Sequence, residues 1–445
     1  MSTSWSALGF SASPYNVQPL KVAEDHVPLL VGRSDDGVQF CTFIDSAPEG
    51  VFVISGSPGV GKTSFFNIFQ HLLESGRASC GPRLLAARTL CPLQADDSAR
   101  VIALRVLQIL IKNVDEWCRI RSRNLPSQIE KLSSWIGGKS SVSWDFSISI
   151  LGNGGGIGRS VQMPAVSEAT FENFQDAISV VVAEVVSRLD FDGVFIALDN
   201  VENLNNDRLS EILMSFRDTL FSVEKVWWVI IGQSGLYSLV QALDSRVTDR
   251  IAGSGLELLP ISLDELSNAV DFRVEKFHER ASGKSPLSNK IHKMLYEASY
   301  GEIRFVFKYC NTICLNVVSD VRKHILAQKI PFTEESFNRI MGESMIEDCI
   351  DDDLAAEVLK RIVALEIDGL GLRQKDKKLL VDIGAAGQAR SKDFKSFGFS
   401  SGQDFSSNYL TRLQAAGLLV RKQEGRAAIY RLRGLSVLAN RFGLL

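Results

Sequence analysis

The sequence lacks the long apolar runs and the leader that mark membrane and secreted proteins. None of its 445 residues belongs to an apolar run approaching the ~18 to 20 residues that a membrane span requires. The first residues, Met-Ser-Thr-Ser-Trp, provide neither a basic region nor an apolar stretch, so no signal peptide is expected. We therefore expect a cytoplasmic protein with no membrane partner.

Cysteine and histidine are too scattered to predict a disulfide framework or a metal centre. The seven cysteines are odd in number and fit a reducing compartment. Cys310 and Cys314 are four residues apart on a predicted helix, but no second ligand pair follows them, so a zinc site is not expected. The five histidines are dispersed, and no Ser–His–Asp or Cys–His pattern accompanies them, so hydrolytic triad chemistry has no support.

A glycine-rich segment at residues 56–63, with the sequence GSPGVGKT, matches the phosphate-binding loop G-x-x-x-x-G-K-[ST]. An apolar strand is predicted over 51–55 before it, and an amphipathic helix begins after it at 64. Glycines let backbone N–H groups turn inward as an anion nest at the helix N-terminus. The chain is therefore expected to bind ATP with Mg²⁺. The residues assigned to this loop are Gly56, Ser57, Pro58, Gly59, Val60, Gly61, Lys62, Thr63 and Ser64.

Lys62 and Thr63 have separate tasks in such a loop. The ammonium group of Lys62 would reach the β- and γ-phosphates, and the hydroxyl group of Thr63 would complete the Mg²⁺ shell. Asp199, at the end of an apolar strand, would hold the same shell through water. Asn200 follows where many such ATPases place a glutamate, and an amide cannot accept a proton from water. Glu202 is the nearest substitute as a water-orienting base, unless it merely caps a surface helix and ATP is bound without turnover.

Strands and helices alternate across the first 260 residues, which predicts a parallel sheet covered on both faces. The fold class is thus α/β: a P-loop NTPase sheet with a helical lid, followed by a winged-helix domain. We expect an N-terminal extended arm at 1–28, an ATPase core at 29–261, lid and linker helices at 262–365 and a winged helix at 371–445. An inserted segment at about 134–162 is either a β-ribbon or a mobile loop. The other expected strands are 83–90, 193–199, 226–233 and 256–259, and the expected helices are 38–44, 98–118, 168–189 and 207–221.

Several motifs together resemble an AAA+ ATPase of the origin-initiator and STAND-like (archaeal-type ATPase) branch. They are Val31-Gly32-Arg33, the phosphate loop, Asp199, and Gly232-Gln233 at a strand end. The similarity continues through the segments 244–251, 259–266 and 301–304 and through Arg273, and covers residues 29–320.

The resemblance assigns roles to further residues. It places Val31 and Arg33 against the adenine and Gln233 as the first sensor. Arg304 would touch the γ-phosphate from the lid. Arg250, with Arg246 as the second choice, would serve as an arginine finger toward a neighbouring subunit, which requires self-association with ATP.

The C-terminal region is strongly basic although the whole chain has a net charge of −3. Residues 371–445 contain 14 Lys and Arg against 5 Asp and Glu, whereas the remaining residues contain 35 against 47. Helix patterns at 374–383, 391–397 and 406–416 precede strands at 418–420 and 428–432, which is the order of a winged helix. Together these features favour double-stranded DNA as the partner, although winged helices also bind proteins. The expected DNA contacts are Ser406, Ser407, Asn408, Thr411 and Arg412 in a groove, and Arg421, Lys422 and Arg426 on the wing.

Two functions from different classes follow. The first is an ATP-hydrolysing switch that couples nucleotide state to DNA binding, in bacterial DNA transactions or in defence against mobile elements. The alternative is a STAND-like signalling regulator with little hydrolysis, whose winged helix binds protein. An acidic segment at 343–353 is a metal site, an internal competitor for the basic wing, or a solvated helix face.

Overall fold

The computed structural model describes residues 4–78, 81–137, 143–146, 159–162, 164–279, 283–346, 349–424 and 427–445. The chain forms two compact units, which we call the core unit and the lid–wing unit. The core unit is Pro19–Leu259, and the lid–wing unit combines Met1–Gln18 with Pro260–Leu445. In the described part of the chain, no helix combines the length and the apolar character needed to cross a bilayer.

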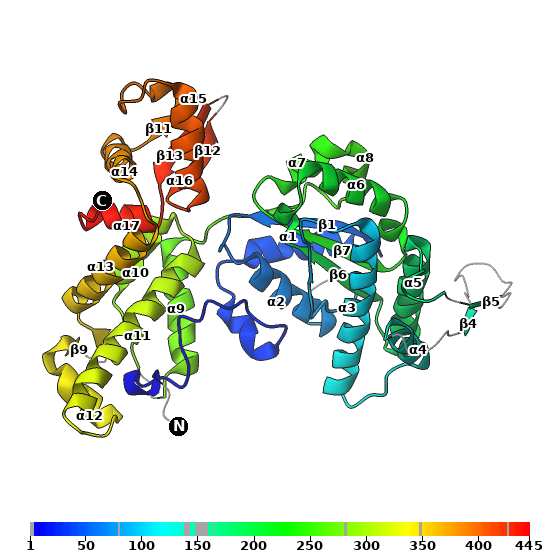
Figure 1. The fold of residues 1–445 in the computed structure, drawn as a ribbon. Helices are drawn as coiled ribbons and strands as arrows, with labels where there is room; N and C mark the ends of the chain where they lie inside the picture. The colour runs from blue at the N-terminus through cyan, green and yellow to red at the C-terminus, as the bar shows by residue number, and fades with distance from the viewer. Residues whose placement is uncertain are drawn as a thin grey trace. The chain divides into compact units, whose positions relative to one another are not determined.

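A six-stranded sheet forms the centre of the core unit (Figure 1). Its main strand order is β2-β6-β7-β1-β8, and β3 also pairs with β6. Every pairing in this sheet is parallel, as the alternation of strands and helices predicts. The strands are β1 (Gly50–Gly56), β2 (Leu84–Leu85), β3 (Cys91–Pro92), β6 (Gly193–Asp199), β7 (Val226–Ile231) and β8 (Leu256–Leu258).

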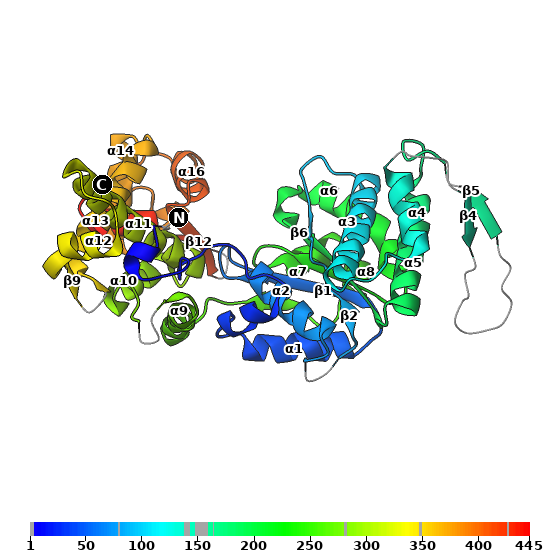
Figure 2. The ribbon, with the colours of Figure 1, turned by 90° about the horizontal axis from the view of Figure 1, so that it is seen from below.

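Both faces of the sheet are buried, because alternate residues of each central strand enter different hydrophobic clusters. On β7, Trp227 and Val229 pack with helices α1 and α2, whereas Trp228 and Ile230 pack with helices α3 to α8. Figure 2 shows α1 and α2 on the opposite side of the sheet from α3. The helices are α1 (Ser34–Asp45), α2 (Lys62–Glu74), α3 (Ala99–Ile120), α4 (Ser127–Ile136), α5 (Phe171–Arg188), α6 (Asn206–Arg217), α7 (Leu236–Leu243) and α8 (Ser245–Thr248).

The strand expected at 83–90 is instead two short strands, β2 and β3, with a gap between them. Side chains from neighbouring helices take the backbone amides in that gap. Gln70 Oε1 accepts from the N–H of Ala87 at 2.7 Å, and Asn113 Oδ1 accepts from the N–H of Thr89 at 2.8 Å. These bonds replace the hydrogen bonds of the strand pairing, so the buried backbone N–H groups keep an acceptor where the chain leaves the sheet.

An antiparallel ribbon lies between α4 and α5 in the sequence. Its strands are β4 (Ser143–Phe146) and β5 (Arg159–Gln162), with Ser143 opposite Gln162. Residues 134–136 of the expected insertion instead end helix α4, and its residues 138–142 and 147–158 lie outside the described residues.

The lid part of the second unit is helical, and the N-terminal residues belong to its core. The expectation of an extended arm is wrong for residues 4–18, because Trp5, Phe10 and Tyr15 are buried among the lid helices. The backbone N–H of Ser11 donates to Phe277 O at 2.8 Å, which fixes the segment beside α9. The elements are α9 (Leu263–Phe277), α10 (Asn289–Ser299), α11 (Ile303–Ala327), α12 (Glu334–Met341), β9 (Met345–Ile346), β10 (Cys349–Ile350) and α13 (Asp352–Gly369).

The C-terminal part of that unit has the helix and hairpin order of a winged helix, but the second helix, expected at 391–397, is only a 3₁₀ turn at Ser391–Asp393. One continuous helical segment, which we call the recognition helix, contains α15, a π-helical turn at Phe405–Leu410, and α16. Two features were not predicted: a third strand, β11, which pairs with β13, and the closing helix α17. The elements are α14 (Gln374–Ala386), β11 (Ala389–Arg390), α15 (Gly402–Asp404), α16 (Thr411–Ala415), β12 (Leu419–Glu424), β13 (Ala427–Leu432) and α17 (Leu435–Arg441).

Candidate nucleotide site and basic wing

The phosphate loop joins the end of β1 to the start of α2, and its shape depends on glycine. Gly56, Gly59 and Gly61 have φ angles of 153°, 77° and 102°, which other residues rarely adopt. A Cβ atom on Gly56 would also lie 2.6 Å from Leu258 O. The Nζ of Lys62 donates to the carbonyl oxygens of Gly56 at 2.8 Å and Ser57 at 3.2 Å, so the ammonium group lies over the loop.

Arg33 supports the loop from behind. Its side chain is buried, and its guanidinium donates to Val60 O at 2.9 Å and to Asp36 Oδ2 at 3.0 Å. Hydrogen bonds from an ionised donor are short and strong, so these two bonds hold the buried guanidinium in place. The structure thus places Arg33 against the protein backbone of the loop, and an adenine contact by Val31 or Arg33 stays a prediction.

Three predicted catalytic residues gather at the ends of β6 and β7. Asp199 is the last residue of β6, and its Oδ1 accepts from the N–H of Asn200 at 2.9 Å. Glu202 is exposed in the following 3₁₀ turn, and its Oε2 lies 3.6 Å from the position a Cβ would take on Gly232. Gly232 is followed directly by the exposed Gln233. Since β7 lies between β6 and β1, Asp199 is two strand spacings, ~10 Å, from the strand that carries the phosphate loop.

Arg250 lies at the other end of β1. The backbone O of Arg250 accepts from the N–H of Val51 at 3.2 Å, and Val51 precedes Gly56 by five residues. At the strand rise of ~3.3 Å per residue, Arg250 is ~17 Å along β1 from its own phosphate loop. This exposed arginine is therefore remote from its own phosphate loop, and its contact with a neighbouring molecule stays a prediction.

Arg250 lies near a cluster of paired arginines and aspartates. Asp218 lies among three arginines, and its pKa is held below the ordinary value, first by the hydrogen bond from Arg217 and then by the charges of Arg217, Arg246 and Arg250. Arg246 also pairs with the buried Asp244 at 3.5 Å. Arg246 is therefore partly committed within the fold, which favours Arg250 over Arg246 as the finger.

The predicted DNA contacts on the recognition helix differ in what else they touch. Ser407, Asn408 and Thr411 are exposed, whereas Ser406 is half-buried and its Oγ accepts from Ser391 Oγ at 3.2 Å. The guanidinium of Arg412 bonds the carboxylate of Asp376, which is fully buried, and also donates to Asn408 O at 3.0 Å. Arg412 thus fastens the recognition helix to α14, a task that sequence reasoning missed.

The predicted wing contacts lie on β12 and beyond it. Arg421 and Lys422 are exposed there, and the Nζ of Lys422 is 5.8 Å from the centre of the Tyr300 ring. Arg426 lies outside the described residues.

A short joint connects the wing to the start of α11. Arg433 pairs with Glu302 at 2.6 Å, and the N–H of Gly434 donates to Ala298 O at 2.7 Å. Gly434 has φ 58° and ψ −115°, and a Cβ there would lie 2.8 Å from the Phe305 ring. Glu302 and Phe305 flank Arg304, which is exposed on the first turn of α11. Arg304 and the wing are therefore both attached at the start of α11. A contact between Arg304 and a γ-phosphate stays a prediction.

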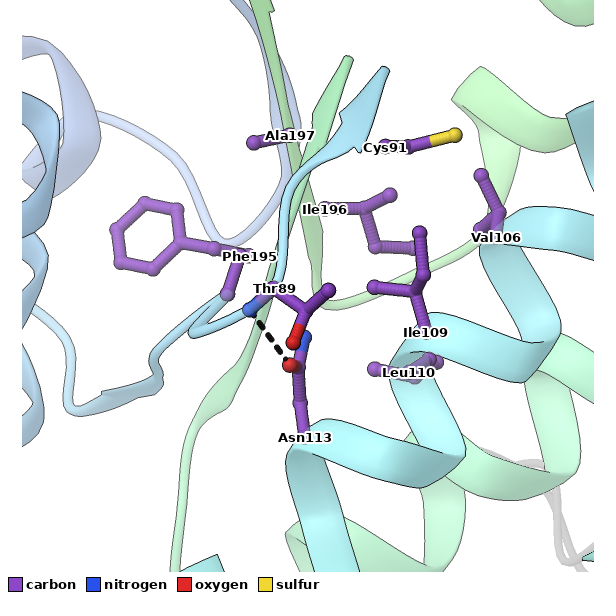
Figure 3. A pocket seen from close by; sticks show the side chains of 10 residues that line it. Thr89, Cys91, Val106, Ile109, Leu110, Asn113, Phe195, Ile196 and Ala197 are labelled. Atoms are coloured by element: carbon purple, nitrogen blue, oxygen red, sulfur yellow. Dashed lines mark hydrogen bonds between the residues drawn. The ribbon is translucent and has the colours of Figure 1, made fainter. Parts of the chain in front are cut away.

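A small internal cavity lies between β6 and α3, with room for about one water molecule (Figure 3). Its walls are mostly apolar, and the backbone N–H of Thr89 donates to the Oδ1 of Asn113 in its lining. It is a packing defect beside the gap between β2 and β3, and it is too small for a nucleotide. Among the described residues, no three His, Cys, Asp or Glu side chains gather as a metal centre.

No family model matches the chain, and no curated protein matches it. Solved structures do. The chain is similar to the Aeropyrum pernix ORC2 protein, solved as ADPNP-ADP complexes, with 12% identity, 97% of this chain and 98% of that chain covered, and a TM-score of 0.50. Further matches are Cdc6p from Pyrobaculum aerophilum, at 12% identity and a TM-score of 0.41, and RuvB from Thermotoga maritima, at 15% and 0.37. They cover 99% and 94% of this chain, and 97% and 95% of theirs.

At 12% identity the ORC2 likeness shows the fold and nothing finer. It confirms the predicted fold class: the chain shares the fold of that protein, a P-loop NTPase parallel sheet followed by a helical region and a C-terminal winged helix.

Proposed function

We propose that this protein binds and hydrolyses ATP and uses the nucleotide state to control binding of double-stranded DNA. One observation carries the nucleotide part: three glycines at positive φ place Lys62 over a phosphate loop. Asp199, Glu202 and Gln233 lie at neighbouring strand ends. The nucleotides in the ORC2 neighbour support the same assignment. Following the resemblance, we place this activity in bacterial DNA transactions or in defence against mobile elements.

The loop amides and Lys62 bind the phosphates, and Ser64 lies in the first turn of α2, whose N-terminus would face them. Mg²⁺ would be held by Thr63 and Asp199, and it supplies charge compensation on the phosphate oxygens. Glu202 orients the attacking water, since its carboxylate is exposed beside Gly232. Gln233 senses the γ-phosphate, and Arg250 contributes charge to the site of a second molecule when ATP brings the molecules together.

DNA binding rests on the charge and surface of the winged helix. Ser407, Asn408 and Thr411 face solvent on one helix, and Arg421 and Lys422 extend the basic surface onto the wing. Residues 371–445 carry the chain's excess of positive charge, which phosphate backbones attract. The joint between Glu302 and Arg433 would pass a movement of Arg304 on to the wing.

The ATPase rates of wild type, Lys62→Ala and Glu202→Gln, each with and without duplex DNA, test this function. We expect DNA to change the wild-type rate, Lys62→Ala to abolish it, and Glu202→Gln to keep ATP binding while losing turnover. Equal rates in all three proteins would refute hydrolysis. DNA affinity is measured separately by fluorescence anisotropy, with and without ATP.

The signalling regulator is the second candidate, favoured by Asn200 in the position of the usual glutamate. It predicts tight ATP binding, negligible turnover and no change in duplex binding when Arg421 and Lys422 are both replaced by Glu. Loss of duplex binding in that double variant would exclude it.

A further inference from the structure

Glu257 occupies an unusual position in the core unit. It is the only charged residue of β8 and lies in register with Ser55 of β1, one residue before the phosphate loop begins. Its Oε2 accepts from the hydroxyl group of the buried Ser55 and from the backbone N–H of Gly235 at 3.3 Å. One carboxylate oxygen thus joins the base of the phosphate loop to the loop after β7.

The loop after β7 carries Gln233 and is attached at both ends. The N–H of Gly232 donates to Ile54 O in β1 at 3.0 Å, and the N–H of Gly235 donates to Glu257 in β8. Gly235 is the N-cap of α7 with φ 82° and has no side chain to serve as a cap, and the carboxylate of Glu257 in β8 accepts its backbone N–H. Gln233 is therefore held between strands that also define the phosphate loop.

The backbone of Leu258, the residue after Glu257, also lies close to the phosphate loop. A Cβ on Gly56 would lie 2.6 Å from the carbonyl oxygen of Leu258. Because Gly56 and Leu258 are paired in register, a shift of β8 would reach Gly56 through the strand pairing and Gly235 through the hydrogen bond.

We propose that Glu257 is a positioning residue for ATP hydrolysis. It holds the Gln233 loop at a fixed distance from the phosphate loop, so that the sensor amide meets the γ-phosphate in the geometry of the reaction. The inference rests on the proposed ATPase function and adds a residue to it. Because Glu257 touches neither phosphate nor water in this role, its loss should lower kcat with little change in the affinity for ATP.

The test compares wild type, Glu257→Ala, Glu257→Gln and Glu224→Ala in the full chain. Glu224 is exposed before β7 and serves as the matched control. We expect Glu257→Ala to lower kcat about ten-fold or more, with KM and the Kd for ATP within about three-fold. Glu257→Gln should recover most of the rate, because its amide oxygen accepts the same two bonds. Glu224→Ala should match wild type.

Amide hydrogen exchange without nucleotide provides a readout that needs no turnover. Exchange in the segment 233–237 should be faster in Glu257→Ala than in Glu257→Gln or wild type. Unchanged exchange there, or a wild-type kcat in Glu257→Ala, would overturn the positioning role alone. An equal loss of kcat in the Ala and Gln variants would also overturn it. A wild type without any ATPase activity would instead refute the proposed hydrolysis and the positioning role with it.

Discussion

The phosphate loop and the winged helix are held in shape by different chemistry. The loop depends on backbone: three glycines at positive φ and a carbonyl oxygen 2.6 Å from where a Cβ would lie. The winged helix depends on charged side chains: Arg412 on the buried Asp376, and Arg433 on Glu302. Backbone geometry tolerates changes of salt and pH but not an added methyl group, whereas ion pairs show the opposite sensitivity. The phosphate loop should therefore be broken by added side-chain atoms, and the winged helix by the loss of a charge.

The largest effect should follow from Gly56→Ala. The new Cβ would meet Leu258 O at 2.6 Å, and φ 153° disfavours any side chain, so the loop must move away from the phosphates. We expect the affinity for ATP to fall about 100-fold or more, the scale on which lost phosphate donors act. Isothermal titration measures it.

Gly76→Ala is the matched control for that variant. Gly76 also has positive φ, at 68°, but a Cβ there meets nothing within 4 Å. It should cost about 1 kcal/mol of stability and leave ATP binding intact. Equal ATP affinities in the two variants would show that strain in general, and not the contact with Leu258, shapes the loop.

Arg412→Ala should cause the next largest effect, on stability. Among the described residues, its loss leaves the fully buried Asp376 carboxylate with the backbone N–H of Arg373, at 3.0 Å, as its one remaining partner. An unpaired buried charge costs about 3 kcal/mol or more, and denaturant unfolding should reveal it in the lid–wing unit. Asp376→Asn with Arg412→Ala should recover part of the loss. Replacing both Arg421 and Lys422 by Glu should weaken DNA binding without lowering the stability. If Arg412→Ala weakens DNA binding but keeps full stability, Arg412 is a direct DNA contact.

The ion pair between Glu302 and Arg433, in the joint between α11 and the wing, should couple ATP binding to DNA binding and contribute little stability. Glu302→Ala should leave the separate affinities for ATP and DNA nearly unchanged but reduce the effect of ATP on DNA binding. A coupling of about 1 kcal/mol corresponds to a five-fold change in DNA affinity, measurable by anisotropy at fixed salt. The charge swap Glu302→Arg with Arg433→Glu should restore it. Full coupling in Glu302→Ala would show that the hydrogen bond from Gly434 alone transmits the movement.

The sequence predicts the fold well where the information is local. Continuous apolar runs that end in polar residues predict β6 and β7 nearly to the residue, and the glycine pattern predicts the phosphate loop. The interrupted strand at 83–90 could not be predicted, since Gln70 and Asn113 reach it from helices distant in the sequence. The tasks of Arg412 and Glu257 depend on partners 36 and 202 residues away. Glu257 could nevertheless have been singled out, because it is the one charged residue in the otherwise apolar segment 256–259. The aromatic residues at 5, 10 and 15 were likewise a sign that the N-terminal segment is buried.

The smallest predicted effect is the pH dependence of the stability of the lid–wing unit. His292 is buried in the lid and bonds the hydroxyl group of Tyr15 at 2.9 Å, and burial lowers its pKa to about 4 from the ordinary 6.5. The unfolded chain therefore binds more protons between these values. The stability of the lid–wing unit is complete above pH 6.5 and falls as the pH drops toward 4. At pH 5.5 this costs about 1 kcal/mol relative to pH 7.

Denaturant unfolding at pH 7 and pH 5.5 measures this loss, with His292→Gln as the control that removes the titrating group. The variant should be less stable at pH 7 but should lose about 1 kcal/mol less than wild type on acidification. An equal pH dependence in wild type and His292→Gln would mean that other groups set the acid sensitivity of the lid, and that the docking of Tyr15 on His292 contributes none of it.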